Sequence, residues 1–324
     1  MTFLETFPLT GKRIWVTGGH GFLGQHVLAE LESRGAQLLA PTEGDCNLLD
    51  PSAAGRFIRS ERPDGVIHLA AKVGGIGANR KHPGSFFYAN MAMGLHLIEA
   101  CRLEHVSKLL VLGTVCAYPK FTPVPFHEND LWNGYPEETN APYGIAKKAL
   151  LVQLQSYRQE YGTRGIFLLP VNLYGPGDHL DLENNHVIPA LIQKFLEAKA
   201  KGNPSVELWG TGNPSREFLF VKDAAQAICV AMSTYEGHEP VNLGTGDEIT
   251  IRDLALLIKQ LVGFEGELVF NPAYPDGQPK RQLDTSRARD YFGWSAQTKL
   301  KEGLHSTIEW IRHSLNASNA HANL

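Results

Sequence analysis

The chain has 324 residues, of which 43% are hydrophobic and 20% are charged, and its formal net charge at pH 7 is −4. This length suffices for one large α/β domain or two coupled lobes with a buried core, and the acidic balance argues against a nucleic-acid partner, whose binding surface usually carries a basic stripe. No apolar run reaches the roughly 18 residues of a membrane span, so we expect no membrane partner.

The first half of the chain alternates short apolar runs with helical patterns. Strands are predicted at residues 13–17, 37–40, 65–70, 108–113 and 165–171, and helices at 22–31, around 91–101 and at 143–161. Continuous apolar strands that alternate with helices are typical of a parallel, doubly wound sheet. We therefore predict an α/β fold of the Rossmann type, with residues 1–175 as a dinucleotide-binding domain.

The pattern changes in the second half of the chain. Pro- and Gly-rich loops separate shorter elements there, with helices predicted at 187–200 and 251–262. We expect residues 176–324 to form a smaller α/β lobe that binds substrate. Two apolar segments in the 217–245 region, 217–221 and 240–243, are predicted to return to the main sheet.

A glycine-rich turn, TGGHGFLG at residues 17–24, follows the first predicted strand and opens a helix. In this context glycines indicate a dinucleotide site, where the pyrophosphate meets the free N–H groups at the helix start. Gly18 would permit the tight turn, Gly21 the approach of the pyrophosphate, and Gly24 the packing of helix on strand. The predicted coenzyme-binding residues in this turn are Gly18, Gly19, His20, Gly21, Phe22, Leu23 and Gly24.

The choice of coenzyme depends on the segment after the second predicted strand. NADP sites usually place a cation near the ribose 2′-phosphate, whereas NAD sites place an acid near the ribose hydroxyl. Residues 40–45 read APTEGD and contain no Lys or Arg, so this segment by itself favours NAD.

Tyr143 and Lys147 are four residues apart in a predicted helix and therefore share one face. A nearby ammonium should lower the pKa of the tyrosine, and it can also hold the nicotinamide ribose. Tyr143 would then give a proton to the alkoxide that forms as a hydride reaches a carbonyl. Thr114, after the fourth predicted strand, is placed to hydrogen-bond the same oxygen. The alternative interpretation is an ordinary pair of side chains on a helix surface.

Several further segments resemble those of a known family. They are AAKVGGI at 70–76, YPK at 118–120, NLYGP at 172–176, NHVIPA at 185–190 and REF at 216–218. With the glycine turn and the Tyr143–Lys147 pair, they resemble the extended short-chain dehydrogenase/reductase family, and within it the GDP-L-fucose synthases. The resemblance runs from about residue 12 to residue 300. It implies NADP(H) as coenzyme, with NAD(H) as the alternative, and a homodimer.

The resemblance also implies a two-stage reaction on GDP-4-keto-6-deoxy-D-mannose or a related nucleotide sugar. The 4-keto group acidifies the hydrogens on C3 and C5, so epimerisation needs a base and an acid on opposite faces of the ring. By resemblance these are Cys116 and His186. Thiols and imidazoles both ionise near neutrality, which suits reversible proton transfer to an enolate. Taken alone, Cys116 would be a small buried side chain and His186 the start of a helix.

The remaining site residues are implied by the same resemblance. Arg216 suits a diphosphate because its guanidinium donates two parallel hydrogen bonds, whereas Lys194 can equally be a solvated charge and Asp276 part of a turn. The family's usual catalytic serine is Thr114 here, which preserves the hydrogen bond, and the arginines that the family commonly places near the adenosine phosphate are missing from 40–45. The implied coenzyme contacts are Lys147, Pro170, Asn172, Leu173 and His186, and the implied substrate contacts are Lys194, Trp209, Arg216 and Asp276.

Other functions remain open on the sequence. A sugar-nucleotide epimerase or dehydratase would retain its NAD, and a dehydratase would place an acid directly after Thr114, where the chain has Val115. A 4-keto reductase for another GDP-deoxysugar or heptose is a closer alternative. A non-catalytic dinucleotide sensor would have no need of Thr114, Tyr143 and Lys147 together.

The four cysteines are widely separated and form no CxxC pair. This spacing suits free thiols in a reducing compartment rather than a disulfide framework or a zinc site. The first ten residues also lack the basic and apolar regions of a signal peptide. We therefore expect a cytoplasmic protein without a bound metal.

Overall fold

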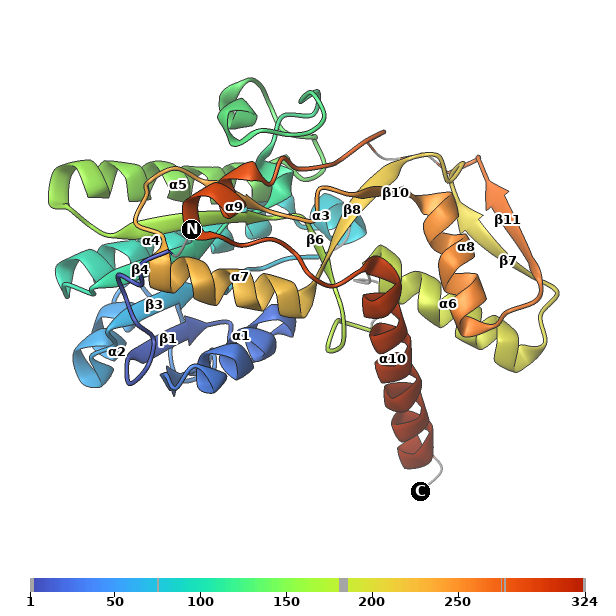
Figure 1. Cartoon of the computed structure of the whole chain (residues 1–324), viewed down its shortest axis with the longest axis horizontal. Helices are drawn as coiled ribbons and strands as arrows, with labels where there is room; N and C mark the ends of the chain where they lie inside the picture. Colours follow the sequence, from blue (N-terminus) through green and yellow to red (C-terminus); the bar gives the residue numbers. More distant parts are fainter. Residues whose placement is uncertain (1–2, 75, 181–185, 275, 277, 323–324) are drawn as a thin grey trace.

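The computed structural model describes residues 3–74, 76–180, 186–274, 276 and 278–322. Within this part of the chain, a parallel sheet of six strands has the order β2-β1-β3-β4-β5-β9. Figure 1 shows β1, β3 and β4 of this sheet side by side. The order reverses between β1 and β3, and doubly wound sheets bind dinucleotides at such a switch point. The predicted α/β fold with a parallel, doubly wound sheet is confirmed. The strands are β1 (Arg13–Thr17), β2 (Gln37–Leu39), β3 (Gly65–His68), β4 (Lys108–Leu112), β5 (Gly165–Pro170) and β9 (Val241–Leu243).

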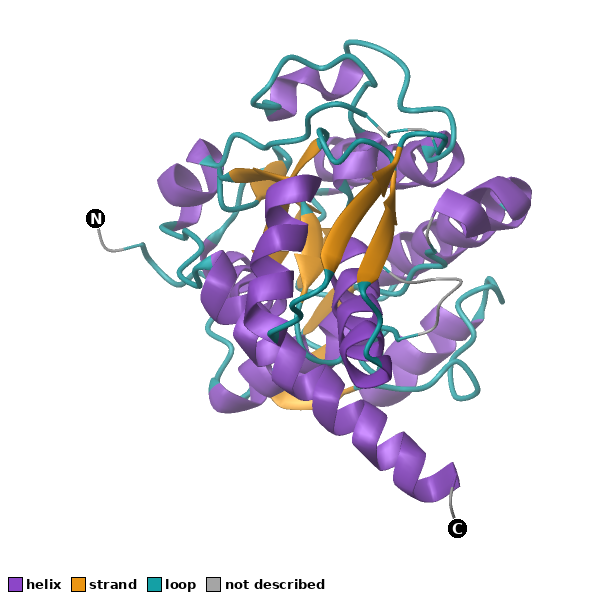
Figure 2. Cartoon of the chain, turned by 90° about the vertical axis from the view of Figure 1, so that its right-hand side faces the viewer, coloured by secondary structure: helices purple, strands orange, loops and turns teal. Residues whose placement is uncertain are grey.

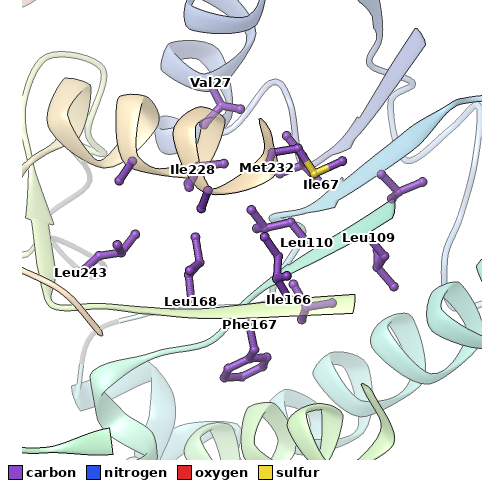
Figure 3. Packing of buried hydrophobic residues seen from close by; sticks show 14 of the residues in the cluster. Val27, Ile67, Leu109, Leu110, Ile166, Phe167, Leu168, Ile228, Met232 and Leu243 are labelled. Carbon is purple, nitrogen blue, oxygen red and sulfur yellow. The ribbon is translucent and has the colours of Figure 1, made fainter. Parts of the chain in front are cut away.

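Helices cover both faces of this sheet. The helices α4 (Pro83–Leu103) and α5 (Ala141–Tyr161) pack side by side on one face, and α1 (Phe22–Ser33) and α7 (Val221–Thr234) pack on the other (Figure 1). Leu110 and Leu168 point from the strands toward α7, whereas Phe167 points toward the opposite layer (Figure 3). Because successive strand side chains alternate between faces, an all-apolar strand buries both of its sides.

The helix α5 carries the predicted Tyr143–Lys147 pair, and its limits follow from its terminal residues. Pro142 lies in the first turn, where its missing N–H leaves no helical bond unmade. Gly162 ends the helix in the left-handed conformation, with φ of 71°. Between these ends, buried Leu150, Leu151 and Leu154 anchor the helix to the core.

A second group of elements lies beside the main sheet in Figure 1 and faces the viewer in Figure 2. Its buried side chains, among them Ile192, Phe195, Leu254 and Ile258, form a hydrophobic cluster separate from that of the main sheet. The domain boundary at residue 175 stays a prediction. The elements are β6 (Asn172–Tyr174), β8 (Ser215–Phe220) and β10 (Glu248–Thr250) in one sheet, β7 (Ser205–Trp209) and β11 (Glu267–Asn271) in another, and the helices α6 (Val187–Lys201), α8 (Ile251–Val262) and α10 (Leu300–Ala322).

The two segments predicted to return to the main sheet differ in outcome. Residues 240–243 do so, because β9 pairs in parallel with β5. The prediction for 217–221 is wrong, because β8 pairs with β6 and β10 instead. The chain returns to the main domain only with α7, whose apolar face packs on α1 and on the strands β4 and β5.

Short elements complete the chain: α2 (Ala53–Glu61), α3 (Ile76–Lys81), α9 (Ser286–Phe292) and the 3₁₀ turns η1 (Val115–Ala117) and η2 (Glu128–Trp132). No helix in the described ranges is both long and apolar enough to cross a membrane. Gly75 and Asn185 of the family-like segments lie outside the described residues.

Candidate active site

A cavity of about 1860 Å³ lies at the carboxyl edge of the main sheet and extends to the second group of elements. Its lining includes the glycine turn after β1, residues 69–74 after β3, residues 113–116 after β4 and Pro170 at the end of β5. Every residue that the sequence assigned to coenzyme, catalysis or substrate lines this one cavity. The structure therefore brings the predicted site residues together, and their individual roles stay predictions.

The glycine turn has the geometry that its sequence predicts. Gly18 has a φ of 70°, and a Cβ there would lie 2.8 Å from the backbone nitrogen of Ala70. A Cβ on Gly24 would lie 2.1 Å from the carbonyl oxygen of Gly18. The helix α1 begins directly after Gly21 without a side chain from the described residues capping its N-terminus, so its first N–H groups remain available. These residues fit a dinucleotide pyrophosphate.

The end of β1 is tied to the end of β3 at this turn. The Thr17 hydroxyl oxygen accepts a hydrogen bond from the Ala70 backbone N–H at 3.2 Å and lies 2.8 Å from Nδ1 of His68. His68 is completely buried, and burial together with the Lys147 charge holds its pKa well below the ordinary value. His68 is therefore neutral and sets the distance between the two strand ends.

Tyr143, Thr114 and Lys147 all line the cavity. Burial raises the pKa of Tyr143, and a hydrogen bond with the Thr114 side chain opposes that rise. The expectation that Lys147 lowers the pKa of Tyr143 is wrong here, because loss of hydration outweighs any effect of the ammonium. A raised pKa keeps the phenol protonated, which is the state a proton donor needs. Burial lowers the pKa of Lys147 to about 8.

Cys116 is positioned by close packing of η1 against α5. A Cβ on Gly144 would lie 2.3 Å from the Cys116 carbonyl oxygen, so only glycine beside Tyr143 permits this approach. The Thr114 hydroxyl oxygen accepts the Cys116 backbone N–H at 3.2 Å, which fixes the turn. The thiol is free and partly exposed toward the cavity.

Two arginines accompany this thiol. Nη1 of Arg281 lies 3.8 Å from Sγ of Cys116, and Gln278 Oε1 accepts a hydrogen bond of 3.0 Å from the Arg281 guanidinium. Arg216 donates to the Gln278 carbonyl oxygen at 2.6 Å, and burial lowers its pKa to about 10. Arg281 is only 9% exposed and was not predicted. It lies 165 residues from Cys116 in the chain, and no motif around it indicates the contact.

His186 is the residue before α6, and a buried carboxylate holds it. Nδ1 of His186 lies 3.1 Å from both carboxylate oxygens of Asp178, whose side chain is 1% exposed. The hydrogen bond to Asp178 raises the pKa of His186. Because a carboxylate only accepts, Nδ1 donates and Nε2 remains for another partner. Asp178 was missed as a site residue, although it ends the YGPGD segment that follows β6.

The predicted substrate contacts lie at the far side of the cavity. The Trp209 ring stacks on Tyr274 with centroids 4.4 Å apart, and Nζ of Lys194 lies 5.8 Å from the Trp209 ring centroid. Asp276 accepts hydrogen bonds from the backbone N–H and the hydroxyl of Thr211 at 2.9 and 2.6 Å. Asp276 therefore fixes the loop after Trp209. Its neighbours Pro275 and Gly277 lie outside the described residues.

The implied coenzyme contacts after β5 lie where the chain passes from the main sheet to the second group of elements. Asn172 and Leu173 are in β6, and the Asn172 amide donates to the Glu217 carbonyl oxygen at 3.0 Å. The Glu217 carboxylate is completely buried and accepts backbone N–H groups from Thr245, Gly246 and Leu283 at 2.5, 2.8 and 2.7 Å. Glu217, which was also missed, thus ties the segment of Arg281 to the strand of Arg216.

The cavity combines the switch point of a doubly wound sheet, a glycine turn that fits a pyrophosphate, and the side chains of Thr114, Tyr143 and Lys147. This combination defines a nicotinamide-dependent enzyme of the extended short-chain dehydrogenase/reductase type. Residues 14–244 match the model of the NAD dependent epimerase/dehydratase family. The chain belongs to the NAD dependent epimerase/dehydratase family, and its curated relatives of 41–43% identity are GDP-L-fucose synthases.

Among those relatives, the probable GDP-L-fucose synthase 1 of Oryza sativa subsp. japonica is 43% identical over 93% of this chain and 92% of its own length. The GDP-L-fucose synthase of Escherichia coli (strain K12) is 41% identical over 94% of this chain and 97% of its own.

Two solved structures are similar over nearly the whole chain. A GDP-6-OMe-4-keto-L-xylo-heptose reductase from Campylobacter jejuni has a TM-score of 0.88 at 29% identity, covering 97% of this chain and 100% of its own. A GDP-L-fucose synthetase from Naegleria fowleri bound to NADP has a TM-score of 0.86 at 27% identity, covering 96% of this chain and 98% of its own.

Proposed function

We propose that this chain is a GDP-L-fucose synthase, which epimerises GDP-4-keto-6-deoxy-D-mannose at C3 and C5 and reduces it at C4 with NADP(H). The observation that carries the proposal is that Thr114, Cys116, Tyr143, Lys147 and His186 line one cavity with the glycine turn. Full-length relatives of 41–43% identity that carry this name support it. The NADP-bound structural relative supports the coenzyme.

In the epimerisation stage, Cys116 and His186 exchange protons with C3 and C5 from opposite faces of the ring. One of them removes a proton to leave an enolate, and the other returns a proton to the opposite face. Asp178 keeps Nε2 of His186 directed at the sugar, since Nδ1 is bound. Arg281 lies beside the Cys116 sulfur, the atom that exchanges the proton, with Nη1 3.8 Å from Sγ.

In the reduction stage, C4 of the sugar would receive its hydride from a reduced nicotinamide coenzyme held at the glycine turn and Lys147. Tyr143 gives its phenolic proton to the C4 oxygen, and Thr114 hydrogen-bonds the same oxygen. Lys147 holds the coenzyme ribose and, as a cation, stabilises the tyrosinate that remains. Arg216 and Lys194 bind the diphosphate of the substrate, and the Trp209 ring contacts its nucleotide.

The direct test is to give the purified protein NADPH with GDP-4-keto-6-deoxy-D-mannose. We expect one coenzyme oxidised per sugar and GDP-L-fucose as the product by NMR. The variant Tyr143→Phe should lose about 10²-fold or more in the hydride step. Absence of coenzyme oxidation with every GDP-4-keto sugar tried would overturn the proposal.

A second candidate is a 4-keto reductase for a GDP-heptose, favoured by the high structural similarity to the Campylobacter jejuni reductase. The two functions differ in the sugar that supports the higher kcat/KM. A GDP-4-keto-heptose turned over faster than the deoxyhexose would select this candidate.

We also propose a homodimer formed through α4 and α5. Tyr88 and Leu95 on α4 and Val152 on the neighbouring α5 are exposed apolar residues, 62%, 39% and 46% exposed. Leu95→Glu should convert the dimer to a monomer in light scattering, whereas the control Val269→Glu on β11 should not. A wild-type monomer at working concentration would refute the dimer.

A cytoplasmic location stays a prediction from the cysteine pattern, and all four cysteines are free.

A further inference from the structure

The cavity wall beyond the glycine turn is built by the segment that follows β2. Pro41, Thr42, Glu43 and residues 46–49 line it, next to His20 of the glycine turn. In a doubly wound sheet the adenosine half of a dinucleotide lies over the end of this second strand. This wall is therefore the surface that meets the adenosine ribose, where NADPH carries a 2′-phosphate and NADH a hydroxyl.

The residues of this wall include no Lys or Arg, and the nearby Arg56 is paired with Asp50. Residues 40–49 contain no Lys or Arg, but they contain Glu43 and Asp45. The Thr42 backbone N–H and hydroxyl both donate to Asp45, at 2.9 and 2.7 Å, so these donors are already engaged. The same bonds lower the pKa of Asp45, which keeps its carboxylate ionised. Within the cavity lining itself, the acid Glu43 thus stands where NADP sites usually place a cation, and Asp45 lies two residues beyond it in the chain.

His20 does not replace the missing arginine. Its Nε2 lies 2.8 Å from the carbonyl oxygen of Ala40. A carbonyl oxygen only accepts, so Nε2 must donate, and in the neutral ring Nδ1 is then an acceptor. The Ala40 carbonyl thus engages Nε2, so His20 lacks the parallel pair of donors with which an arginine binds a phosphate.

Glu43 is free to meet the ribose. No hydrogen bond or ion pair to another described residue engages its carboxylate, and the side chain is exposed to the cavity. An acid about 20 residues after the glycine turn is the group that hydrogen-bonds the ribose hydroxyls in NAD sites. The same carboxylate would repel a 2′-phosphate.

We propose that this coenzyme site does not select NADPH over NADH, and that Glu43 is the residue that removes the selection. The inference rests on the proposed function only in that a reduced nicotinamide binds the cavity. NADPH and NADH then both serve as hydride donors, in proportion to their concentrations. NADP(H), the coenzyme that the relatives support, thus binds this site but is not preferred over NAD(H).

The test measures binding in the absence of sugar, by nicotinamide fluorescence or calorimetry with the full chain. We expect the dissociation constants of NADPH and NADH to agree within about threefold, or NADH to bind more tightly. NADPH binding that is tighter by more than about threefold would overturn the inference and leave the proposed function standing. If neither coenzyme binds, the proposed hydride transfer fails, and this inference fails with it.

A charge reversal tests the role of Glu43 itself. Glu43→Arg should tighten NADPH by about tenfold or more and leave NADH within about twofold. The matched control is Glu32→Arg, which makes the same charge change on an exposed position of α1 that does not line the cavity. Equal effects of the two variants, or no change in the NADPH constant with Glu43→Arg, would overturn the assignment.

Discussion

Both carboxylate oxygens of Asp178 lie 3.1 Å from Nδ1 of His186. The Asp178 side chain is 1% exposed, whereas that of His186 is 46% exposed. The backbone N–H of His179 donates to the same carboxylate at 2.8 Å, which fixes its orientation. A buried acid thus holds Nδ1 of a partly exposed imidazole, and the proposed proton transfer falls to Nε2.

Asp178→Asn should slow epimerisation by about 10²-fold, because the imidazole loses its fixed tautomer. Asp178 raises the pKa of His186, so its removal lowers that pKa, and the imidazolium form is lost at a lower pH. The measurement is the pH profile of deuterium entry at the sugar carbons from heavy water. The control Asp247→Asn changes an exposed acid outside the cavity. If the pH profile of deuterium entry does not shift in Asp178→Asn, Asp178 has only a structural role.

The sequence sufficed wherever function depends on local backbone geometry. The turn of Gly18 and Gly24 and the spacing of Tyr143 and Lys147 are local patterns, and the structure places them as predicted. Parallel strands read as apolar runs, so the doubly wound sheet followed directly.

Local sequence patterns could not predict contacts between segments that lie far apart in the chain. Arg281 meets Cys116 from 165 residues away, and the Glu217 carboxylate binds backbone N–H groups from two separate stretches of the chain. The segment 217–221 was misplaced because a buried apolar strand looks the same in either sheet. The direction of the Tyr143 pKa was wrong because burial, which sequence does not show, dominates.

Gly24→Ala should abolish tight coenzyme binding. The added Cβ would lie 2.1 Å from the Gly18 carbonyl oxygen, so α1 must move away from the turn. We expect the NADPH dissociation constant to rise by about 10²-fold and the thermal midpoint to fall by several degrees. Gly84→Ala is the control, since a Cβ there meets nothing within 4 Å. Equal coenzyme affinity in both variants would refute the glycine turn as the coenzyme-binding site.

The hydride step should depend on pH through Lys147. Its pKa is lowered to about 8 by burial, so its ammonium is present below that pH and is lost above it. Single-turnover coenzyme oxidation should therefore decline as the pH rises through about 8. Because a guanidinium stays charged, any activity that Lys147→Arg retains should not show this decline. The same decline in that variant would assign the ionisation to another group.

Cys116→Ser and His186→Asn should separate the two stages of the reaction. Both variants should lose inversion at C3 and C5, because each removes one of the two proton-transfer groups. Reduction of the uninverted ketone should persist and give a different deoxysugar, visible by NMR. Normal GDP-L-fucose at the normal rate from both variants would remove these roles.

The most direct test of the account is the wild-type reaction of GDP-4-keto-6-deoxy-D-mannose with unlabelled reduced coenzyme in heavy water. If a thiol and an imidazole exchange protons with the enolate while a hydride reaches C4, GDP-L-fucose will carry deuterium at C3 and C5 and none at C4. Reduced product without deuterium at C3 and C5, still in the starting configuration, would contradict the account.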